Sequence, residues 1–241
     1  MMTNSKAIVL NTLKYGESKI FINVYSREYG MTTLSCSSAR KKKGGGKLNC
    51  FQPMNIVEVE FELKPKADIH PLREVRIDYP SSSIASDPYK LSISIFLAEF
   101  LRYALKNEQK NYILFDYITQ SMEWLDTAQK SFSNFHLIFM VKLSRFIGFY
   151  PDMESFYPGS TFDLRDGIFT AHPALQGNVL KAADSSLVLT LDRLSFASMH
   201  LLKLSREQRN ECTEMILKYY RYHLPSFPEL KSFAILKELF V

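Results

Sequence analysis

Apolar and polar residues alternate along the first third of the chain, and a period of two is typical of strands that have one face on a core. The clearest run is 55–63, in which Val57 and Phe61 alternate with glutamates. A later strand is expected to point Val75 and Ile77 inward. The same pattern predicts strands over 6–15, 19–26 and 30–39. Five short strands are too few for a sandwich and favour a small closed barrel of the OB type, which leaves few exposed strand edges.

The pattern of apolar and polar residues changes near residue 80. Residues 80–88 are rich in serine and proline and are expected to form a linker. Beyond them the apolar period becomes about 3.6 residues, which is typical of helices. Asp87 followed by Pro88 predicts a helix start, and Ser205 with Gln208 predicts a capping box at the start of a later helix.

The second part of the chain has further helical patterns and one hairpin pattern. Helical patterns cover 112–125, 135–147 and 228–240. The second of these is apolar on most sides, which is typical of a buried helix. Asp166-Gly167 between apolar flanks predicts a small hairpin over 162–169. The predicted fold class is therefore α+β with two domains, an OB-fold β-barrel over 1–80 and an all-α helical domain with a small hairpin insertion over 81–241.

The excess of positive charge lies in the first predicted domain. Residues 1–80 contain 13 basic and 8 acidic side chains, whereas the rest of the chain contains 17 of each. The densest part is the segment 40–47, which we call the basic run. Its cations, which surround three glycines, are Arg40, Lys41, Lys42, Lys43 and Lys47. Such a run gains nothing from a packed core, so it indicates either a solvated loop or a loop that binds a polyanion.

Four more lysines occupy positions at which an OB-fold meets its ligand. OB-folds bind oligonucleotides through strands 2 and 3 and through the loops that join strands 1 to 2 and 4 to 5. Lys14 and Lys19 flank the first of those loops, and Lys64 and Lys66 lie in the second. We call these four the loop lysines. Their positions favour contact with the phosphates of a nucleic acid.

Aromatic side chains are the second requirement for holding a single strand, because bases stack on them. Alternation along 19–26 turns Phe21 and Tyr25 away from the core, and Tyr15 flanks the first loop. These three residues are therefore candidates for base stacking. Packing against a neighbouring domain explains outward aromatics equally well, so both interpretations stay open.

An acidic stripe follows the outer face of the strand over 55–63. It consists of Glu58, Glu60 and Glu62, which should repel phosphates. Arg76 is expected to neutralise this stripe across the sheet rather than to contact nucleic acid.

The residue patterns do not indicate catalysis, a cofactor or a metal. The histidines are dispersed, and Cys36 and Cys50 have no histidine close to them in the sequence. The glycines of the basic run lack the spacing of a phosphate-binding P-loop. Nothing in the sequence assembles a nucleophile, a base and an orienting acid. The sequence therefore predicts a protein that is not an enzyme and that has neither a metal site nor a cofactor.

The cellular compartment is inferred from cysteine usage and hydropathy. Cys36, Cys50 and Cys212 are too few and too scattered for a disulfide framework, which favours a reducing compartment. The apolar run 7–10 is too short for the core of a signal peptide, and no stretch reaches the ~20 apolar residues that a membrane span requires. A cytoplasmic protein that does not bind membranes is expected.

Several short runs resemble the RecO family of bacterial DNA repair proteins. They are AIVL, YGES, SREYG and ARKKK in the first predicted domain, then FQPM, and finally LRYAL and IGFYPD in the helical part. The resemblance follows the order of the family over the whole chain and is most specific over residues 1–45.

The resemblance implies a non-enzymatic mediator of recombinational repair. Members of this family bind single- and double-stranded DNA, anneal complementary strands, and join RecR to help load the RecA recombinase. They also bind the acidic, Phe-ended C-terminal tail of single-stranded DNA-binding protein through the helical domain. In this sequence the run FMVKLSRFIG offers Lys142 and Arg145 as candidates for that contact. Whether RecF takes part is left open.

Some members of the family hold zinc with four cysteines in the segment that corresponds to 150–169. This sequence has no cysteine there, so zinc is not carried over. The small hairpin is therefore expected to be held by packing.

Three other interpretations stay open at the level of the residues. They are an OB-fold RNA-binding or translation-associated protein, an interaction adaptor whose basic run is only solvated, and an enzyme that acts on DNA. Competition between DNA and structured RNA, alanine replacement of residues 40–43, and a search for turnover of DNA would separate them. The resemblance favours the DNA-binding mediator.

Overall fold

The computed structural model describes residues 1–37, 49–172 and 178–239. The chain forms two compact units. The first comprises Met1–Thr127 and Leu230–Leu236, and the second comprises Ala128–Glu229 and Lys237–Val241. Within the described residues, none of the helices combines the length and the apolar composition that crossing a membrane requires.

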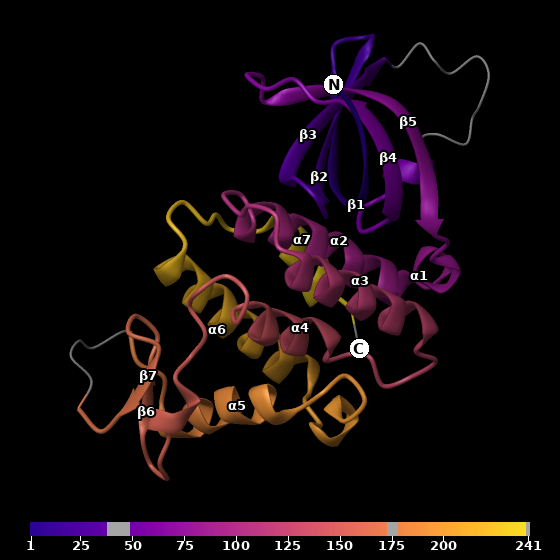
Figure 1. Cartoon of the computed structure of the whole chain (residues 1–241). Coiled ribbons are helices and arrows are strands. Elements are labelled where there is room, and N and C mark those ends of the chain that lie inside the picture. Colours follow the sequence, from indigo (N-terminus) through magenta and orange to yellow (C-terminus); the bar gives the residue numbers. More distant parts are fainter. Residues whose placement is uncertain (38–48, 173–177, 240–241) are drawn as a thin grey trace. The chain divides into compact units, whose positions relative to one another are not determined.

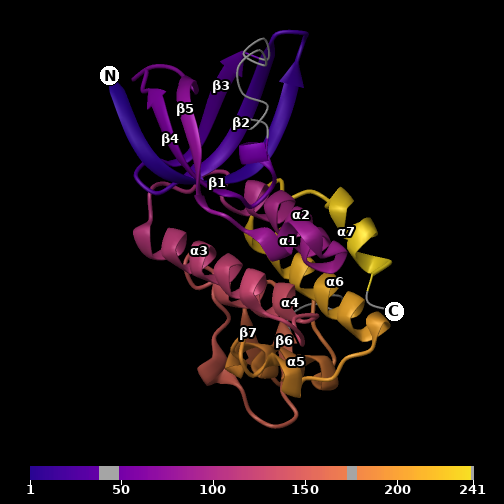
Figure 2. The ribbon, with the colours of Figure 1, turned by 90° about the vertical axis from the view of Figure 1, so that its right-hand side faces the viewer.

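The N-terminal strands of the first unit close into a barrel (Figures 1 and 2). These strands are β1 (Met2–Tyr15), β2 (Lys19–Ser26), β3 (Gly30–Ser37), β4 (Ile56–Glu62) and β5 (Ile69–Tyr79). Their order around the barrel is β1-β2-β3-β5-β4, and β3 and β5 run parallel whereas the other neighbours are antiparallel. A short 3-10 helix, η2 (Asn49–Phe51), precedes β4. The predicted OB-fold barrel is confirmed.

Apolar residues at every second position of the strands form the barrel core, as the sequence predicts. Val57 and Phe61 on β4 are fully buried, and both belong to the barrel core with residues of each neighbouring strand. Ile77 pairs with Val57 and so lies on the inward side of β5. It is nevertheless 38% exposed, because it lines a cavity at the end of the strand.

Helices complete the first unit. They are α1 (Ser82–Ser86), α2 (Pro88–Ala104), α3 (Tyr112–Thr127) and most of α7 (Lys231–Lys237). The helix start at Asp87 is confirmed, since its carboxylate accepts the backbone N–H groups of Tyr89 and Lys90. At the start of α7, Glu99 of α2 accepts the N–H groups of Lys231 and Ser232.

The segment predicted to be a linker contains the helix α1. Asp126 of α3 accepts the backbone N–H of Ile84 at 2.8 Å. The buried Lys90 ammonium of α2 donates to Ser83 Oγ at 2.7 Å and to the Asp126 carbonyl at 3.0 Å. A serine-rich segment becomes helical here because partners that are distant in sequence hold it.

The turn between β2 and β3 packs against the connection between α2 and α3. Gly30 lies in this turn with φ +68°, and a Cβ at this position would lie 2.7 Å from the carbonyl oxygen of Glu108. The Glu108 carbonyl accepts the N–H of Met31 at 3.3 Å. Arg27 reaches Asp116 of α3 at 3.3 Å, with its guanidinium above the ring of Tyr112. The barrel and these helices therefore form one unit.

The second unit is built around α4. Its elements are α4 (Phe135–Leu143), η3 (Met153–Ser155), β6 (Thr161–Asp163), β7 (Ile168–Thr170), α5 (Ala182–Arg193), η4 (Met199–Leu201) and α6 (Arg206–His223). The predicted capping box of Ser205 and Gln208 opens α6, and the predicted hairpin is formed by β6 and β7. Almost every residue of α4 is buried, as its sequence predicts, but the helix ends at Leu143, before the predicted end. The sequence pattern did not predict α5.

Candidate nucleic-acid interface

Lys14 and Lys19 lie on either side of the loop that joins β1 to β2. Tyr15 pairs with Lys19 across this hairpin, and Gly16 makes the turn with φ +59°. Both lysines are exposed. The antiparallel register therefore fixes the backbone positions from which two cationic side chains extend at one tip of the barrel.

Lys64 and Lys66 are both exposed in the loop between β4 and β5. This loop is ordered by its own hydrogen bonds. The N–H of Ala67 donates to the Lys64 carbonyl at 3.2 Å, and the N–H of Lys64 donates to Nδ1 of His70 at 3.3 Å. Burial lowers the pKa of His70, which keeps its ring neutral and able to accept this bond. Figures 1 and 2 show that this loop and the β1–β2 loop lie at the end of the barrel that faces away from α2.

The loop lysines differ from other cations of the barrel in their partners. Among the described residues, none of the four forms a salt bridge. By contrast, Lys6, Arg73 and Arg76, which we call the wall cations, are held by carboxylates at 2.7–2.8 Å. A cation that is already neutralised contributes little to binding a polyanion, so this difference favours the loop lysines, whose contact with phosphates stays a prediction.

An exposed apolar patch lies on one face of the β1–β2 hairpin, where Tyr15 pairs with Lys19. Tyr15 is 64% exposed and Leu13 is 56% exposed, and Phe21 is half-buried. The rings of Tyr15 and Phe21 are 5.5 Å apart between centroids, and Leu13 pairs directly with Phe21 across the strands. Tyr15 and Phe21 thus remain accessible in part, and base stacking on them stays a prediction. Leu13 was not among the predicted residues, although alternation along β1 places it on the same face as Tyr15.

The prediction that Tyr25 stacks bases is wrong. Its ring is fully buried and lies 6.4 Å from the ring of Phe115 on α3. Its hydroxyl donates to the carbonyl of Gln109 at 3.1 Å, and burial raises its pKa to about 12. Alternation does turn Tyr25 away from the barrel core, but the helices cover that part of the sheet. For this residue the packing interpretation holds.

The cations of the basic run lie outside the described residues. This applies to Arg40, Lys41, Lys42, Lys43 and Lys47. Their role in binding phosphates stays a prediction.

The acidic stripe on β4 is neutralised at Glu58 and Glu62, and at Glu58 the partner is Arg76, as predicted. Arg76 pairs with Glu58 across the sheet and reaches its carboxylate at 2.8 Å. Arg73 holds Glu62 at 2.7 Å and lowers the pKa of that carboxyl. Glu60 faces Glu74 directly. On the β4–β5 wall carboxylates therefore already neutralise Arg73 and Arg76, and phosphate binding at the β1–β2 tip stays a prediction.

Comparison with known proteins assigns the family over the whole chain. Residues 1–79 match the family model described as "Recombination protein O N terminal", and residues 85–232 match "Recombination protein O C terminal". The chain belongs to the RecO family. A curated DNA repair protein RecO from Phocaeicola vulgatus is 40% identical over 240 residues, and one from Bacteroides fragilis is 38% identical over 241. A third, from Porphyromonas gingivalis, is 33% identical over 246 residues. In each case 100% of both chains is covered.

The two candidates for the partner tail in this RecO family member already have partners within the second unit. The Lys142 ammonium donates to the Asp192 carbonyl at 3.1 Å, and burial lowers its pKa. Arg145 donates to the Asp192 carboxylate and to the Tyr150 hydroxyl, each at 2.6 Å, and lies over the Tyr150 ring. Both contacts tie the end of α4 to the end of α5. Their role in holding a partner tail stays a prediction.

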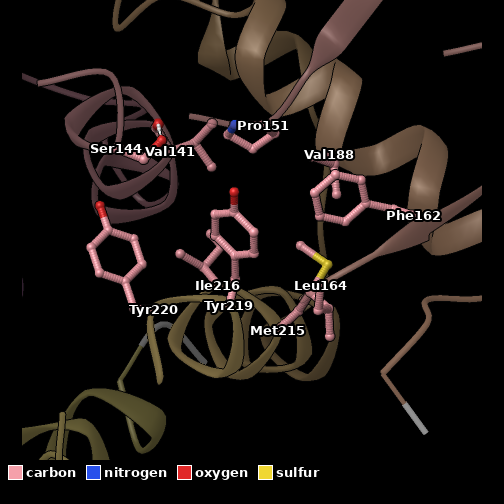
Figure 3. A pocket seen from close by; sticks show the side chains of 10 residues that line it. All are labelled: Val141, Ser144, Pro151, Phe162, Leu164, Val188, Met215, Ile216, Tyr219 and Tyr220. Carbon is pink, nitrogen blue, oxygen red and sulfur yellow. Dashed lines mark hydrogen bonds between the residues drawn. The ribbon is translucent and has the colours of Figure 1, made fainter. Parts of the chain in front are cut away.

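Figure 3 shows an apolar cavity in the second unit, which the ring of Tyr219 enters from α6. Side chains from α4, the hairpin, α5 and α6 line it. Its volume is about 20 Å³. That is room for a water, whereas benzene is known to occupy cavities of about 150 Å³. This cavity therefore cannot hold the phenyl ring of a tail that ends in phenylalanine.

The hairpin of this RecO family member is held by aromatic packing, as expected for a sequence without cysteines in this segment. Phe162 lies 4.8 Å from Phe169 and 5.7 Å from Tyr219 of α6, and Phe156 meets Phe169 edge-on at 5.2 Å. Ser155 Oγ accepts the N–H of Phe169 at 2.8 Å. Over the described ranges, the structure contains no group of three or more potential metal-ligating side chains.

A substitution at Gly167 tests how closely this hairpin packs on α6. Gly167 has φ +69°, and a Cβ there would lie 2.9 Å from the hydroxyl of Tyr219. We expect Gly167→Ala to destabilise the second unit by about 2 kcal/mol, from left-handed backbone strain and the displaced tyrosine. Gly159→Ala is the control, because Gly159 also has positive φ but open space around it, and about 1 kcal/mol is expected. Equal losses in denaturant unfolding of the two variants would contradict the packing.

Proposed function

We propose that this protein binds single- and double-stranded DNA through the tip of its barrel, anneals complementary strands, and helps to load a recombinase onto DNA coated with single-stranded DNA-binding protein. The observation that carries the proposal is the set of loop lysines, exposed and without salt bridges among the described residues, together with the exposed patch of Leu13, Tyr15 and Phe21 on the β1–β2 hairpin. Membership of a family whose curated relatives are named DNA repair proteins supports it. The proposed activity involves no catalysis.

Annealing follows physically from this arrangement. Lysines at loop tips neutralise phosphates and do not occupy the hydrogen-bonding edges of the bases. Two complementary strands that share the same cationic surface then repel each other less, while their bases stay free to pair. Exposed aromatic side chains hold unpaired bases by stacking and release them without sequence preference. Binding should therefore depend strongly on salt and weakly on sequence.

We further propose that the second unit recruits protein partners. RecR, the acidic tail of single-stranded DNA-binding protein and RecF are the partners that membership of the family suggests. Arg145 is the better candidate of the two proposed tail contacts, because its side chain is 47% exposed whereas Lys142 is half-buried. The proposal places this work in the cytoplasm, where bacterial DNA lies.

The proposal is tested by strand annealing on coated DNA. Complementary oligonucleotides are coated with the cognate single-stranded DNA-binding protein, either intact or lacking its C-terminal tail, and duplex formation is followed with and without this protein. We expect annealing to be accelerated with the intact coat and much less with the truncated coat. No acceleration on either coat would contradict the mediator function. Addition of structured RNA as a competitor should leave the acceleration unchanged if DNA is the ligand.

A further inference from the structure

A cavity of the first unit is lined by none of the loop lysines. Its volume is about 570 Å³, and it lies between the turn that precedes β4, the end of β5, and α1. Figure 1 shows α1 directly beyond the end of β5. Its apolar floor includes Ile77, Ile84 and Leu91, and Gln52 and Ser81 are among the polar residues that line it. A volume in this range is typical of small-molecule sites.

The lining of this cavity is neutral. Every described residue that lines it is apolar, an amide, a hydroxyl-bearing residue or proline, and none carries a formal charge. In a protein with 23% charged residues, a neutral lining of this size favours an uncharged ligand group. Acidic peptides and free phosphates therefore fit the cavity poorly.

The walls of the cavity are held by the fold itself. Met54 has φ +65°, a left-handed conformation that is costly for this residue type, and its N–H donates to the Val9 carbonyl at 2.7 Å. The Asn55 amide donates to the Asn49 carbonyl at 2.8 Å. On the opposite side, Asp126 fixes α1 through the N–H of Ile84. The cavity is therefore formed before any ligand enters.

Two polar side chains in the lining have unused hydrogen-bonding capacity. Within the described part of the chain, neither the Gln52 amide nor the Ser81 hydroxyl forms a hydrogen bond, and Ser81 does not cap α1 although it precedes that helix. Ile77 is also left 38% exposed on the inward side of its strand. Apolar surface beside free amide and hydroxyl groups matches an unstacked nucleobase, which offers two flat faces and a hydrogen-bonding edge.

We propose that this cavity binds a nucleobase of single-stranded DNA. Lys47, the last cation of the basic run, precedes the lining residue Asn49 by two positions in the sequence. A neutral base site thus follows directly along the chain after a segment suited to phosphates. The inference rests on the proposed DNA binding and adds to it a specific site for a base.

A variant that fills the cavity tests the proposal. Ala85 is an exposed residue of α1 that lines the cavity, and leucine is a good helix former, so Ala85→Leu occupies the space without disturbing the helix. Ser86→Leu is the control, because Ser86 is the exposed neighbour that does not line the cavity. Dissociation constants are measured for an oligodeoxythymidine and for an abasic oligomer of the same length.

We expect Ala85→Leu to weaken binding of the oligodeoxythymidine by about tenfold, which is the scale of one stacked base, and to leave binding of the abasic oligomer unchanged. Ser86→Leu should change neither. Equal affinities of wild type and Ala85→Leu for the oligodeoxythymidine, or an equal loss for both oligomers, would overturn the proposal. The affinity of the wild type for both oligomers can depend steeply on salt while Ala85→Leu binds them as the wild type does. That result would refute the base site and leave the proposed function intact.

Discussion

Gly30→Ala is expected to destabilise the first unit by about 3 kcal/mol. Of this, about 1 kcal/mol comes from forcing a side chain into the left-handed conformation that Gly30 adopts at φ +68°. The added Cβ would also lie 2.7–2.8 Å from backbone atoms of Glu108, Gln109 and Lys110, which have to move. That movement weakens two hydrogen bonds, from the Tyr25 hydroxyl to the Gln109 carbonyl and from the Met31 N–H to the Glu108 carbonyl, and bonds of this kind contribute about 1 kcal/mol each.

The measurement is urea unfolding followed by the fluorescence of Trp124, the single tryptophan of the sequence, which lies on α3 of the same unit. Gly16→Ala is the matched control. Gly16 has a similar φ of +59°, but nothing lies within 4 Å of the position of its Cβ. We expect the control to lose about 1 kcal/mol, from backbone strain alone. If both variants lost the same stability, the close approach of the β2–β3 turn to the helices would be contradicted.

Acid is expected to destabilise the second unit through His136. This residue of α4 is fully buried, and burial, with a smaller contribution from Arg209, lowers its pKa from 6.5 to about 3. The unfolded chain therefore binds a proton that the folded unit excludes. The neutral ring is fully compatible with the fold above pH 6.5, and stability is lost as the pH falls from 6.5 toward 3. The slope approaches about 1.4 kcal/mol per pH unit in this window.

Hydrogen exchange of the α4 amides between pH 7 and pH 4 measures this loss, after correction for the intrinsic exchange rate. His136→Gln should reduce the dependence on pH by that slope, whatever its stability at neutral pH, because the carboxylates that also titrate are common to both proteins. His200→Gln, a change at an exposed histidine, should leave the dependence unchanged. If His136→Gln kept the wild-type slope of stability against pH, His136 would not be the responsible group.

The barrel could be predicted from the sequence because its signal is local. Apolar and acidic residues alternate along β4, and that alternation alone determines which side of the strand is buried. The Ser205–Gln208 capping box is likewise a local pattern, and it opens α6 where predicted. Each of these features needs only neighbouring residues to form.

The missed features depend on distant partners. The pattern of α5 is interrupted because Ser185 occupies a fully buried position, where its hydroxyl accepts the N–H of Phe162 at 2.7 Å. In the same way, α1 is held by Asp126 and Lys90 rather than by its own composition. Tyr25 shows the corresponding limit for the site: alternation gives the face on which a side chain lies, but not what covers that face.

The interface could be predicted in part. The exposure of the loop lysines follows from their position at loop tips, and the sequence locates them correctly. The sequence does not show that the wall cations are neutralised by carboxylates across strands, because that requires the register of β1, β4 and β5. This difference in pairing is the physical basis on which we propose phosphate binding for the loop lysines and not for the wall cations.

The dependence of single-stranded DNA binding on salt tests the central claim most directly. Each phosphate that is neutralised on a single strand contributes about −0.7 to the slope of log K against log salt concentration. Replacing the four loop lysines by alanine should therefore make the slope shallower by about 3. Replacing the three wall cations by alanine should leave the slope nearly unchanged. Equal slopes for wild type and the loop-lysine variant, or a larger change on loss of the wall cations, would contradict the account.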